Sequence, residues 1–423
     1  MFAKEACMYK KRALEKTIDS AAKGYAAITI YGARQTGKST FVYSHFGPSF
    51  PIVTLDDLDE LALAKSNPKL FLEAHPWPVA IDEIQKAPSL LPLIKEAIDK
   101  EKRKWLFEGK EPRLMYILTG SSQIELRQAV SDSLAGRTAI FNMASFSLDE
   151  IDGNDRGPFI PEVKAITEAS SKGFRYRTRV ELFEEIFKGG MPEYRASELD
   201  RDTFFHSYVL TYLEKDVGAL VPTEMLHTFR LFLEYIALRT GQQIVYEDVA
   251  GGVGIDARTV KRWLSVLEST NIVYFLRPYA SSLSDRVTKN PKLYFLDTGL
   301  AAYLCRWPSA SMLEKSSMAG AFFETFVISE IVKTHLGAGR VLEELPFYYY
   351  RDKDQKEADF IYETTDGIIP VEIKKGINPV SSSFNFNYLR KYKKPVKKGL
   401  VIACRDAVLP INEDVWYCPV ALI

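Results

Sequence analysis

The sequence lacks several features that would assign it to a specialised class of protein. Lys and Arg number 55, as do Asp and Glu, so no overall positive charge indicates nucleic-acid binding and any such contact must come from a local patch. The four cysteines are scattered, without C-x-x-C spacing, which argues against a zinc site or a disulfide framework. No apolar run approaches the ~18 residues of a membrane span, and the charged start MFAKEACMYKKR is unlike a signal peptide. We therefore expect a reducing, cytoplasmic setting and no membrane partner.

What is present is the composition of an ordinary folded protein, with 46% hydrophobic and 26% charged residues. A chain of 423 residues exceeds one ordinary core, and its length alone predicts about three domains. Its patterns divide it into four parts. We expect an α/β core with a parallel sheet at 1–145, a helical lid at 146–225, a winged helix-turn-helix at 226–308 and a nuclease-like α/β domain at 309–423.

The strongest motif is a glycine loop between a predicted strand, 27–31, and a predicted helix. The loop GARQTGKS fits G-x-x-x-x-G-K-[ST] without a mismatch. Such a loop directs several backbone N–H groups at one phosphate, and the helix N-terminus adds positive charge. Lys38 would bind the β- and γ-phosphates of ATP, and Ser39 would offer its hydroxyl to Mg²⁺. The residues expected around the nucleotide are Gly32, Ala33, Arg34, Gln35, Thr36, Gly37, Lys38, Ser39 and Thr40.

A second apolar segment, 78–81, ends in Asp82 and Glu83, which is the expected second half of a phosphate-loop site. Asp82 would hold Mg²⁺ together with Ser39, and Glu83 would orient or deprotonate the attacking water. The alternative is that the two carboxylates cap the next helix, expected over 89–98.

Two further polar positions follow predicted strands. Ser121 and Ser122 come after the strand at 114–118, where either would reach the γ-phosphate or the attacking water; capping the next helix is the alternative. Arg137 precedes another apolar strand and would stabilise transition-state charge in its own site or, in a homo-oligomer, in a neighbour's site. A surface salt bridge is the alternative for Arg137.

The pattern over 245–264 predicts helix, turn, helix, with Asp256 as the N-cap of the second helix. Strand-like segments at 272–276 and 292–296 would add a wing, giving a winged helix-turn-helix. Three basic residues on the outer face of the second helix are candidates for contact with DNA: Arg258, Lys261 and Arg262. The alternative is a winged helix used only for packing or dimerisation.

Segments 357–362 and 369–374 alternate like strands, and the Asp-Gly pair between them predicts a two-residue hairpin turn. That turn would set Asp359 opposite Lys374. Because side chains alternate with period two, Asp359, Glu372 and Lys374 would emerge on one face.

This combination matches the D…(E/D)-x-K constellation of restriction-endonuclease-like enzymes. Asp359 and Glu372 would bind Mg²⁺, and Lys374 would steady a hydroxide or the developing phosphorane charge. Glu324, a charge on an apolar helical stripe, would add a third carboxylate, since a buried carboxylate needs a partner. The alternative is a salt-bridged sheet face, because Asp359 and Lys374 are themselves a favourable cross-strand pair.

The motifs GARQTGKST, AIDEIQ, LTGSS and SLAGR, followed by GGMPE, YLEKD and YFLDTGL, extend over nearly the whole chain. In these motifs the chain resembles the bacterial and archaeal AAA-type ATPases that carry an uncharacterised C-terminal region. The resemblance implies ATP binding and hydrolysis, a doubly wound parallel sheet and a nuclease-like C-terminal fold. Ser39 stands where many members have Thr, and the hydroxyl is kept.

Two hypotheses follow. In the first, a Mg²⁺-dependent ATPase is coupled to a nuclease-like domain and acts on or near DNA through the winged helix. In the second, the protein is an ATP-gated switch whose C-terminal domain binds a protein partner and cuts nothing.

Overall fold

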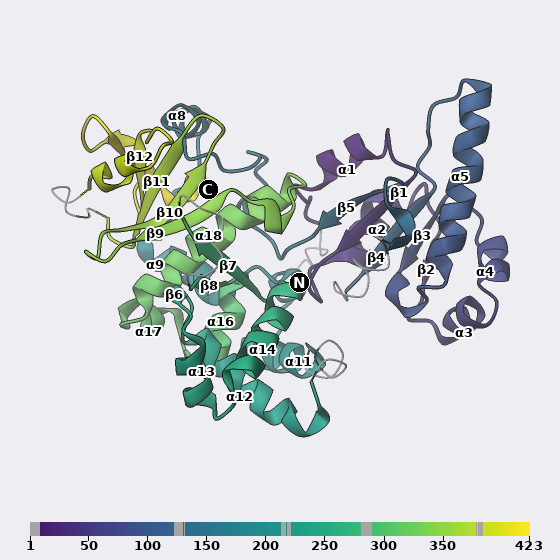
Figure 1. The fold of residues 1–423 in the computed structure, drawn as a ribbon, viewed down its shortest axis with the longest axis horizontal. Helices are drawn as coiled ribbons and strands as arrows, with labels where there is room; N and C mark the ends of the chain where they lie inside the picture. The colour runs from purple at the N-terminus through teal and green to yellow at the C-terminus, as the bar shows by residue number, and fades with distance from the viewer. Residues whose placement is uncertain are drawn as a thin grey trace, which may run out of the picture. The chain divides into compact units, whose positions relative to one another are not determined.

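The computed structural model describes residues 9–121, 130, 132–212, 217, 221–280, 290–377, 379 and 384–423. It divides into two compact units, each of which is described by itself (Figure 1). The first unit contains Met1–Phe146, Met191–Ala196 and His335–Leu342; the second contains Ser147–Gly190, Ser197–Thr334 and Glu343–Ile423. The segment expected as a helical lid is therefore shared between the two units and does not form a unit of its own.

The first unit is built on a five-stranded parallel sheet of order β2-β3-β4-β1-β5. Its strands are β1 (Ala27–Tyr31), β2 (Ile52–Thr54), β3 (Val79–Asp82), β4 (Tyr116–Gly120) and β5 (Thr138–Asn142). Its main helices are α1 (Glu15–Ala21), α2 (Lys38–Phe46), α3 (Leu58–Ser66), α4 (Pro68–Ala74), α5 (Leu90–Glu108) and α10 (Pro192–Ala196).

Every residue of β1 is buried because helices cover both faces of this sheet. Alternate positions of the strand enter two separate cores. Tyr31 packs in the core that includes Ile94 and Ile98 of α5, and Ile30 packs in the core that includes Phe41 of α2. The parallel sheet expected from the apolar runs is present, with its phosphate loop leaving the central part of the sheet.

The second unit begins with helices, as the sequence pattern indicates. They are α7 (Leu148–Asp152), α8 (Val163–Ser171), α9 (Arg179–Lys188), α11 (Arg201–Tyr212), α12 (Leu226–Ala237), α13 (Tyr246–Val253), α14 (Ala257–Ser269), α16 (Thr298–Leu304), α17 (Ala310–Lys315) and α18 (Ala319–Gly337), the last of which ends in the first unit. Short 3-10 helices lie at Ile84–Lys86, Thr223–Met225, Leu342–Glu344, Asn387–Lys391 and Val420–Leu422.

A nine-stranded sheet of order β13-β14-β12-β11-β10-β9-β7-β8-β6 runs through the second unit. Its strands are β6 (Gln242–Gln243), β7 (Val273–Pro278), β8 (Lys292–Phe295), β9 (Phe347–Arg351), β10 (Glu357–Glu363), β11 (Ile368–Lys374), β12 (Gly399–Ala403), β13 (Leu409–Pro410) and β14 (Val415–Pro419). β7 pairs with β8 antiparallel and with β9 in parallel. The boundary expected at 308/309 is therefore not a boundary of this sheet, which joins the strands on either side of it.

The β10–β11 hairpin differs from the expected register. Phe360 pairs with Val371 and Glu363 with Ile368. The next two residues, Thr364 and Gly367, close the turn, because the Thr364 N–H donates to the Gly367 carbonyl at 2.8 Å, and Thr365 and Asp366 lie between them. The hairpin turn has two residues as expected, but its expected position at Asp366-Gly367 was wrong, because the chain closes the turn one position earlier on each side. The pairing shifts by two residues, which changes the partners but keeps every side chain on its predicted face.

No helix within the described residues is both long enough and apolar enough to cross a bilayer.

Candidate functional site

The glycine loop of the first unit joins β1 to α2 and needs both of its glycines. Gly37 has φ +85°, a conformation that side-chain-bearing residues rarely adopt. At Gly32, a Cβ would lie 2.1 Å from the carbonyl oxygen of Met143. The glycines of the motif thus allow the backbone turn that the sequence pattern predicts, and Gly32 also allows a close approach to Met143 that it does not predict.

Lys38 is buried and folds back over this loop. Its Nζ donates to the carbonyls of Gly32 at 2.9 Å and Ala33 at 2.8 Å. The hydroxyl of Thr36 also donates to the Ala33 carbonyl, at 2.9 Å. The ammonium is therefore held at the concave side of the loop by groups of the loop itself, at the place where a phosphate-binding charge is required.

Arg12 is a second basic residue at the loop, and no sequence motif identifies it. Its Nη1 donates to the carbonyl of Thr36 at 2.8 Å and its Nη2 to that of Ala144 at 2.6 Å. Its guanidinium also lies 4.8 Å from the ring centroid of Phe146. Arg12 is buried and fixes the loop from a position 24 residues earlier in the chain.

Asp82 and Ser39, expected to share a metal ion, lie in direct contact. The hydroxyl of Ser39 donates to Oδ2 of Asp82 at 2.7 Å, and the hydroxyl of Thr119, at the end of β4, donates to Oδ1. β4 lies between β3 and β1, so its end reaches both halves of the site. Thr119 was not among the predicted site residues, although it lies two residues before the candidate Ser121.

Glu83, the next residue, is held by Ser121. The hydroxyl of Ser121 donates to Oε2 of Glu83 at 3.1 Å and its N–H to the same oxygen at 3.4 Å, while the amide of Gln85 donates there as well. Of the two candidate serines, Ser122 lies outside the described residues. Glu83 has φ +58°, a strained conformation for a non-glycine residue that occurs preferentially at functional sites.

Neither carboxylate caps the following helix, which was the alternative interpretation. The N-cap of α5 is Ser89, without a side-chain cap bond. A hydroxyl and a carboxylate in contact supply hard oxygen ligands, and Mg²⁺ prefers to take one or two of these together with water and phosphate oxygens. Ser39 and Asp82 therefore fit a nucleotide-bound Mg²⁺ ion.

Arg137 lies away from this group in its own chain. It immediately precedes β5, whose first residue pairs with Ala27 at the start of β1, whereas the glycine loop follows the end of β1. Its Nε and Nη2 donate to the two oxygens of Asp99 at 3.0 and 3.1 Å. The expectation that Arg137 serves the site of its own subunit is wrong, because the chain uses it in the salt bridge that was the alternative.

The second unit contains a group of acidic side chains that we call the carboxylate cluster: Glu324, Glu357, Asp359 and Glu372. Asp359 and Glu372 share one sheet face with Lys374, as predicted from strand alternation. The Nζ of Lys374 lies 2.7 Å from Oε2 of Glu372 and 3.3 Å from Oδ2 of Asp359. The same Asp359 oxygen accepts the N–H of Ile373 at 2.8 Å.

Lys292, which the sequence analysis did not single out, extends from β8 into this cluster. Its Nζ lies 2.7 Å from Oε1 of Glu357, 3.0 Å from Oε1 of Glu324 and 3.9 Å from Oδ1 of Asp359. Tyr294, also on β8, donates its hydroxyl to the same Glu324 oxygen at 2.6 Å. Lys292 sits at the start of a predicted wing strand, so its sequence pattern pointed to sheet pairing rather than to this site.

Burial and mutual repulsion shift the titration of the cluster. Burial, followed by the charge of Asp359, raises the pKa of Glu372 to about 8 and that of Glu324 to about 7. Burial alone would raise the pKa of Asp359 as well, but the charges of Lys374 and Lys292 outweigh burial and hold that pKa below its ordinary value. Burial opposes the charge of Lys292, yet the surrounding carboxylates raise its pKa. Both ammonium groups are therefore charged at neutral pH.

The expected Mg²⁺ site of Glu324, Asp359 and Glu372 does not fit this arrangement. Among the described residues, no group of three or more His, Cys, Asp or Glu side chains is placed to hold a metal ion. The reason is visible in the contacts: one ammonium bridges Glu324 and Glu357, and the other bridges Asp359 and Glu372. The alternative of a salt-bridged face describes these contacts better, although Lys374 pairs with two carboxylates instead of one.

The three candidate DNA-binding residues lie on α14 and are exposed, whereas Val260, Trp263 and Leu264 on the same helix are buried. The N-terminus of α14 is capped by Asp256, which accepts the Thr259 N–H at 2.9 Å. Arg258, Lys261 and Arg262 therefore belong to the solvent face of a well-started helix, as predicted.

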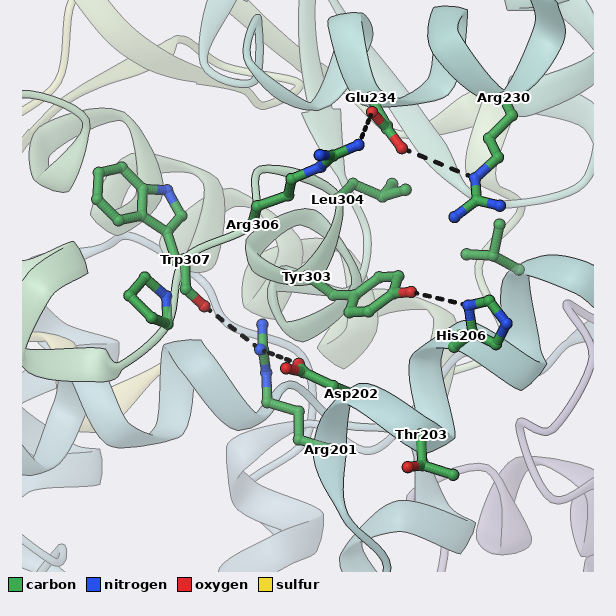
Figure 2. A pocket seen from close by; sticks show the side chains of 12 residues that line it. Arg201, Asp202, Thr203, His206, Arg230, Glu234, Tyr303, Leu304, Arg306 and Trp307 are labelled. Carbon is green, nitrogen blue, oxygen red and sulfur yellow. Dashed lines mark hydrogen bonds and ion pairs between the residues drawn. The ribbon is translucent and has the colours of Figure 1, made fainter. Parts of the chain in front are cut away.

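The second unit also contains a cavity of about 570 Å³ between α11, α12 and the end of α16. Figure 2 shows Glu234 between Arg306 and Arg230, with contacts of 3.0 and 3.7 Å, and Tyr303 directed at His206. Arg201, on the opposite side, donates to Asp202 at 2.9 Å. Three guanidinium groups share two carboxylates in this cavity, since Arg230 and Arg306 both contact Glu234, so its lining carries one excess positive charge.

Comparisons with known proteins match three separate stretches of the chain. Residues 25–152 match the family described as "AAA domain", while residues 179–311 and 319–423 match two families described as domains of unknown function, DUF8612 and DUF4143. Two curated relatives, the uncharacterized proteins Mb2031c of Mycobacterium bovis and Rv2008c of Mycobacterium tuberculosis, are each 25% identical over 355 residues, 83% of this chain and 71% of theirs.

Two solved structures have weak likenesses to the chain. The Walker-type ATPase PABY2304 of Pyrococcus abyssi has a TM-score of 0.40 at 14% identity and covers 70% of this chain and 96% of its own. The STAND protein PH0952 of Pyrococcus horikoshii has a TM-score of 0.20 at 13% identity, and the match covers 78% of this chain and 48% of that protein's chain. Neither score supports a conclusion about this chain. The match over residues 25–152, with the parallel sheet and glycine loop described above, supports an AAA-type ATPase domain in this part of the chain.

Proposed function

We propose that the first unit binds ATP with Mg²⁺ and hydrolyses it. The observation that carries this proposal is the 2.7 Å contact between the Ser39 hydroxyl and the Asp82 carboxylate, which brings the glycine loop and the Asp-Glu strand together. Bound Mg²⁺ would supply charge neutralisation at the β- and γ-phosphates. Ser39 and Asp82 would hold it, and Lys38 would exchange its loop carbonyls for phosphate oxygens.

Glu83 is the residue proposed to orient or deprotonate the attacking water. Its carboxylate is held by Ser121 and Gln85, which leaves it few orientations. A preoriented carboxylate loses less freedom when it acts on water, so it is a better general base than a mobile one. Ser121 would act as a positioning residue through Glu83.

The decisive test is ATP turnover by the full chain with and without Lys38. We expect Lys38→Ala to lower kcat/KM at least about 100-fold, as loss of a preorganised charge does, and to weaken nucleotide binding measured by calorimetry. Normal turnover by a folded Lys38→Ala variant would remove the basis of this proposal.

For the second unit, we propose contact with DNA through α14. Support comes from the three exposed basic residues on this helix and from the order of the elements α12, β6, α13, α14, β7 and β8, which is that of a winged helix. Fluorescence anisotropy with duplex DNA tests this. Changing Arg258, Lys261 and Arg262 together to Ala should weaken binding and reduce its salt dependence, whereas Lys172→Ala, an exposed lysine paired with Glu168, should not.

Coupling of ATP hydrolysis to a nuclease-like domain remains the first candidate for the C-terminal strands, supported by the convergence of Asp359, Glu372 and Lys374. Strand breakage in supercoiled DNA, scored together with ATP hydrolysis, tests it. If this candidate is right, wild type should break the DNA and Asp359→Ala should not.

The second candidate is an ATP-gated switch that binds a protein partner and cuts nothing. It is favoured by Lys292, whose ammonium lies among the carboxylates that a nuclease would use. If this second candidate is right, neither wild type nor Asp359→Ala should cut any nucleic-acid substrate, and both should still hydrolyse ATP.

A further inference from the structure

We propose that Lys292 is the resident cation of the carboxylate cluster and keeps divalent metal ions out of it. The inference bears on the same site as the nuclease-like proposal but predicts how that site is regulated. The sequence pattern of Glu324, Asp359 and Glu372 is typical of a metal site, but in the structure the carboxylate cluster surrounds an ammonium group.

The contacts of Lys292 are those of a bound cation. Its Nζ lies within 3.0 Å of one oxygen from each of Glu324 and Glu357 and 3.9 Å from Asp359, and it faces the ring of Tyr349 at 5.6 Å from the centroid. Its side chain is only 5% exposed. The buried ammonium and the carboxylates around it stabilise one another. Removing the ammonium or the carboxylates therefore leaves an uncompensated buried charge.

The second lysine completes the neutralisation. Lys374 bridges Asp359 and Glu372, so each of the four carboxylates has an ammonium within 4 Å. A divalent cation entering this cluster would be repelled by two ammonium groups that already contact its carboxylate oxygens.

The cation is supplied by a different part of the unit from the acids. Lys292 opens β8 and pairs with Leu276 of β7 and Gln243 of β6, whereas Asp359 and Glu372 lie on β10 and β11. Tyr294, two residues along β8, holds Glu324 as well. Displacement of β8 would therefore withdraw the ammonium and the phenol together and release Glu324 from both, whereas Asp359 would keep Lys374 at 3.3 Å and Glu357 would keep Arg351 at 3.9 Å.

Mn²⁺ titration of the full chain without nucleotide, followed by calorimetry and by the electron paramagnetic resonance signal of free Mn²⁺, tests the proposal. Wild type should show no Mn²⁺ site that depends on Asp359, so wild type and Asp359→Asn should give the same isotherm. Lys292→Met should gain one equivalent of Mn²⁺, bound at least about tenfold more tightly than any site of wild type, and the gain should vanish in Lys292→Met/Asp359→Asn.

Two controls separate charge removal from general loosening. Lys333→Met removes another buried lysine of the same unit, which donates to Glu330 at 2.9 Å, and should gain no Mn²⁺ site. Lys292→Arg keeps the charge and should also gain none. If Lys292→Met does not fold, Lys292→Gln keeps a donor toward Glu357 and serves in its place, with near-ultraviolet circular dichroism as the check of folding.

Two results would overturn the inference. One is an Mn²⁺ site in wild type that Asp359→Asn abolishes, because Lys292 would then not exclude the metal. The other is a folded Lys292→Met or Lys292→Gln without a new site. DNA breakage decides the nuclease-like proposal separately, since wild type that cuts nothing would end that proposal and leave the Mn²⁺ result for Lys292 standing.

Discussion

The carboxylate of Asp297 accepts the backbone N–H of Gly190 at 2.9 Å across 107 residues of sequence. The same side chain caps α16 by accepting the N–H of Leu300 at 3.1 Å. Two motifs that marked the resemblance without naming a reaction, GGMPE and YFLDTGL, therefore meet at one buried carboxylate. Gly189 must approach it closely: a Cβ there would lie 2.2 Å from Oδ1 of Asp297 and 2.8 Å from the Gly299 nitrogen.

Gly189→Ala should destabilise the protein by about 2–4 kcal/mol, because the new methyl group overlaps Asp297 and the backbone has φ +70°. Urea unfolding of the second unit's tertiary signal measures the loss. Gly173→Ala is the matched control: its φ is +84°, but nothing lies within 4 Å of its Cβ position, so it should cost only about 1 kcal/mol. Equal losses in the two variants would contradict the packing argument.

Glu83→Gln should lower kcat for ATP by about 100-fold or more while nucleotide binding changes little, because it removes the general base and keeps the shape. Ser121→Ala should lower kcat less and leave KM unchanged, since Ser121 acts through Glu83 by a 3.1 Å hydrogen bond. Steady-state turnover and calorimetry separate the two effects. Loss of nucleotide affinity in Glu83→Gln, with kcat retained, would assign Glu83 to binding instead.

Ser39→Thr should retain ATP turnover within a few-fold, whereas Ser39→Ala should need a much higher Mg²⁺ concentration for half-maximal rate. The hydroxyl that contacts Asp82 at 2.7 Å persists in the first variant and is lost in the second. Turnover measured against Mg²⁺ at fixed ATP provides the comparison. An unchanged Mg²⁺ requirement in Ser39→Ala would exclude Ser39 as a ligand of the ion.

Arg137→Ala and Asp99→Ala should each change the free energy of unfolding little, because their pair is partly exposed and water screens it. Both should leave ATP turnover unchanged if the pair is only structural. Loss of turnover in Arg137→Ala but not in Asp99→Ala, more severe at high protein concentration, would instead reveal that Arg137 completes the site of a neighbouring subunit.

The stability of the second unit should depend on pH through Glu372, whose pKa is raised to about 8 in the folded protein from 4.5. A carboxyl group with a raised pKa binds its proton more tightly when folded, so its contribution is greatest below pH 4.5 and declines as pH rises toward 8. Glu372→Gln should therefore become more stable relative to wild type as pH rises from 5 to 8, by on the order of a few kcal/mol. Urea unfolding in chelator at both pH values measures this, and a difference independent of pH would contradict it.

The parts that the sequence predicted well are those in which a local pattern determines geometry. The glycine loop follows from two glycines and an apolar strand, and the faces of β10 and β11 follow from alternation, which survives an error of two residues in register. The contacts that the sequence did not predict depend on residues or strands that lie far apart in the chain. Arg12 reaches the loop from before β1, and Lys292 enters the cluster because β7 pairs with β9, a contact that no local pattern encodes.

That pairing of β7 with β9 has a practical meaning for dissecting the protein. In a fragment that starts at residue 309, the edge of β9 that pairs with β7 would be unpaired. In a fragment that stops at residue 308, β7 would lack β9 as its neighbour. Bare strand edges recruit other chains, so either half expressed alone should be prone to self-association. When the two halves are mixed, they should form a soluble complex, because β7 of one fragment can again pair with β9 of the other.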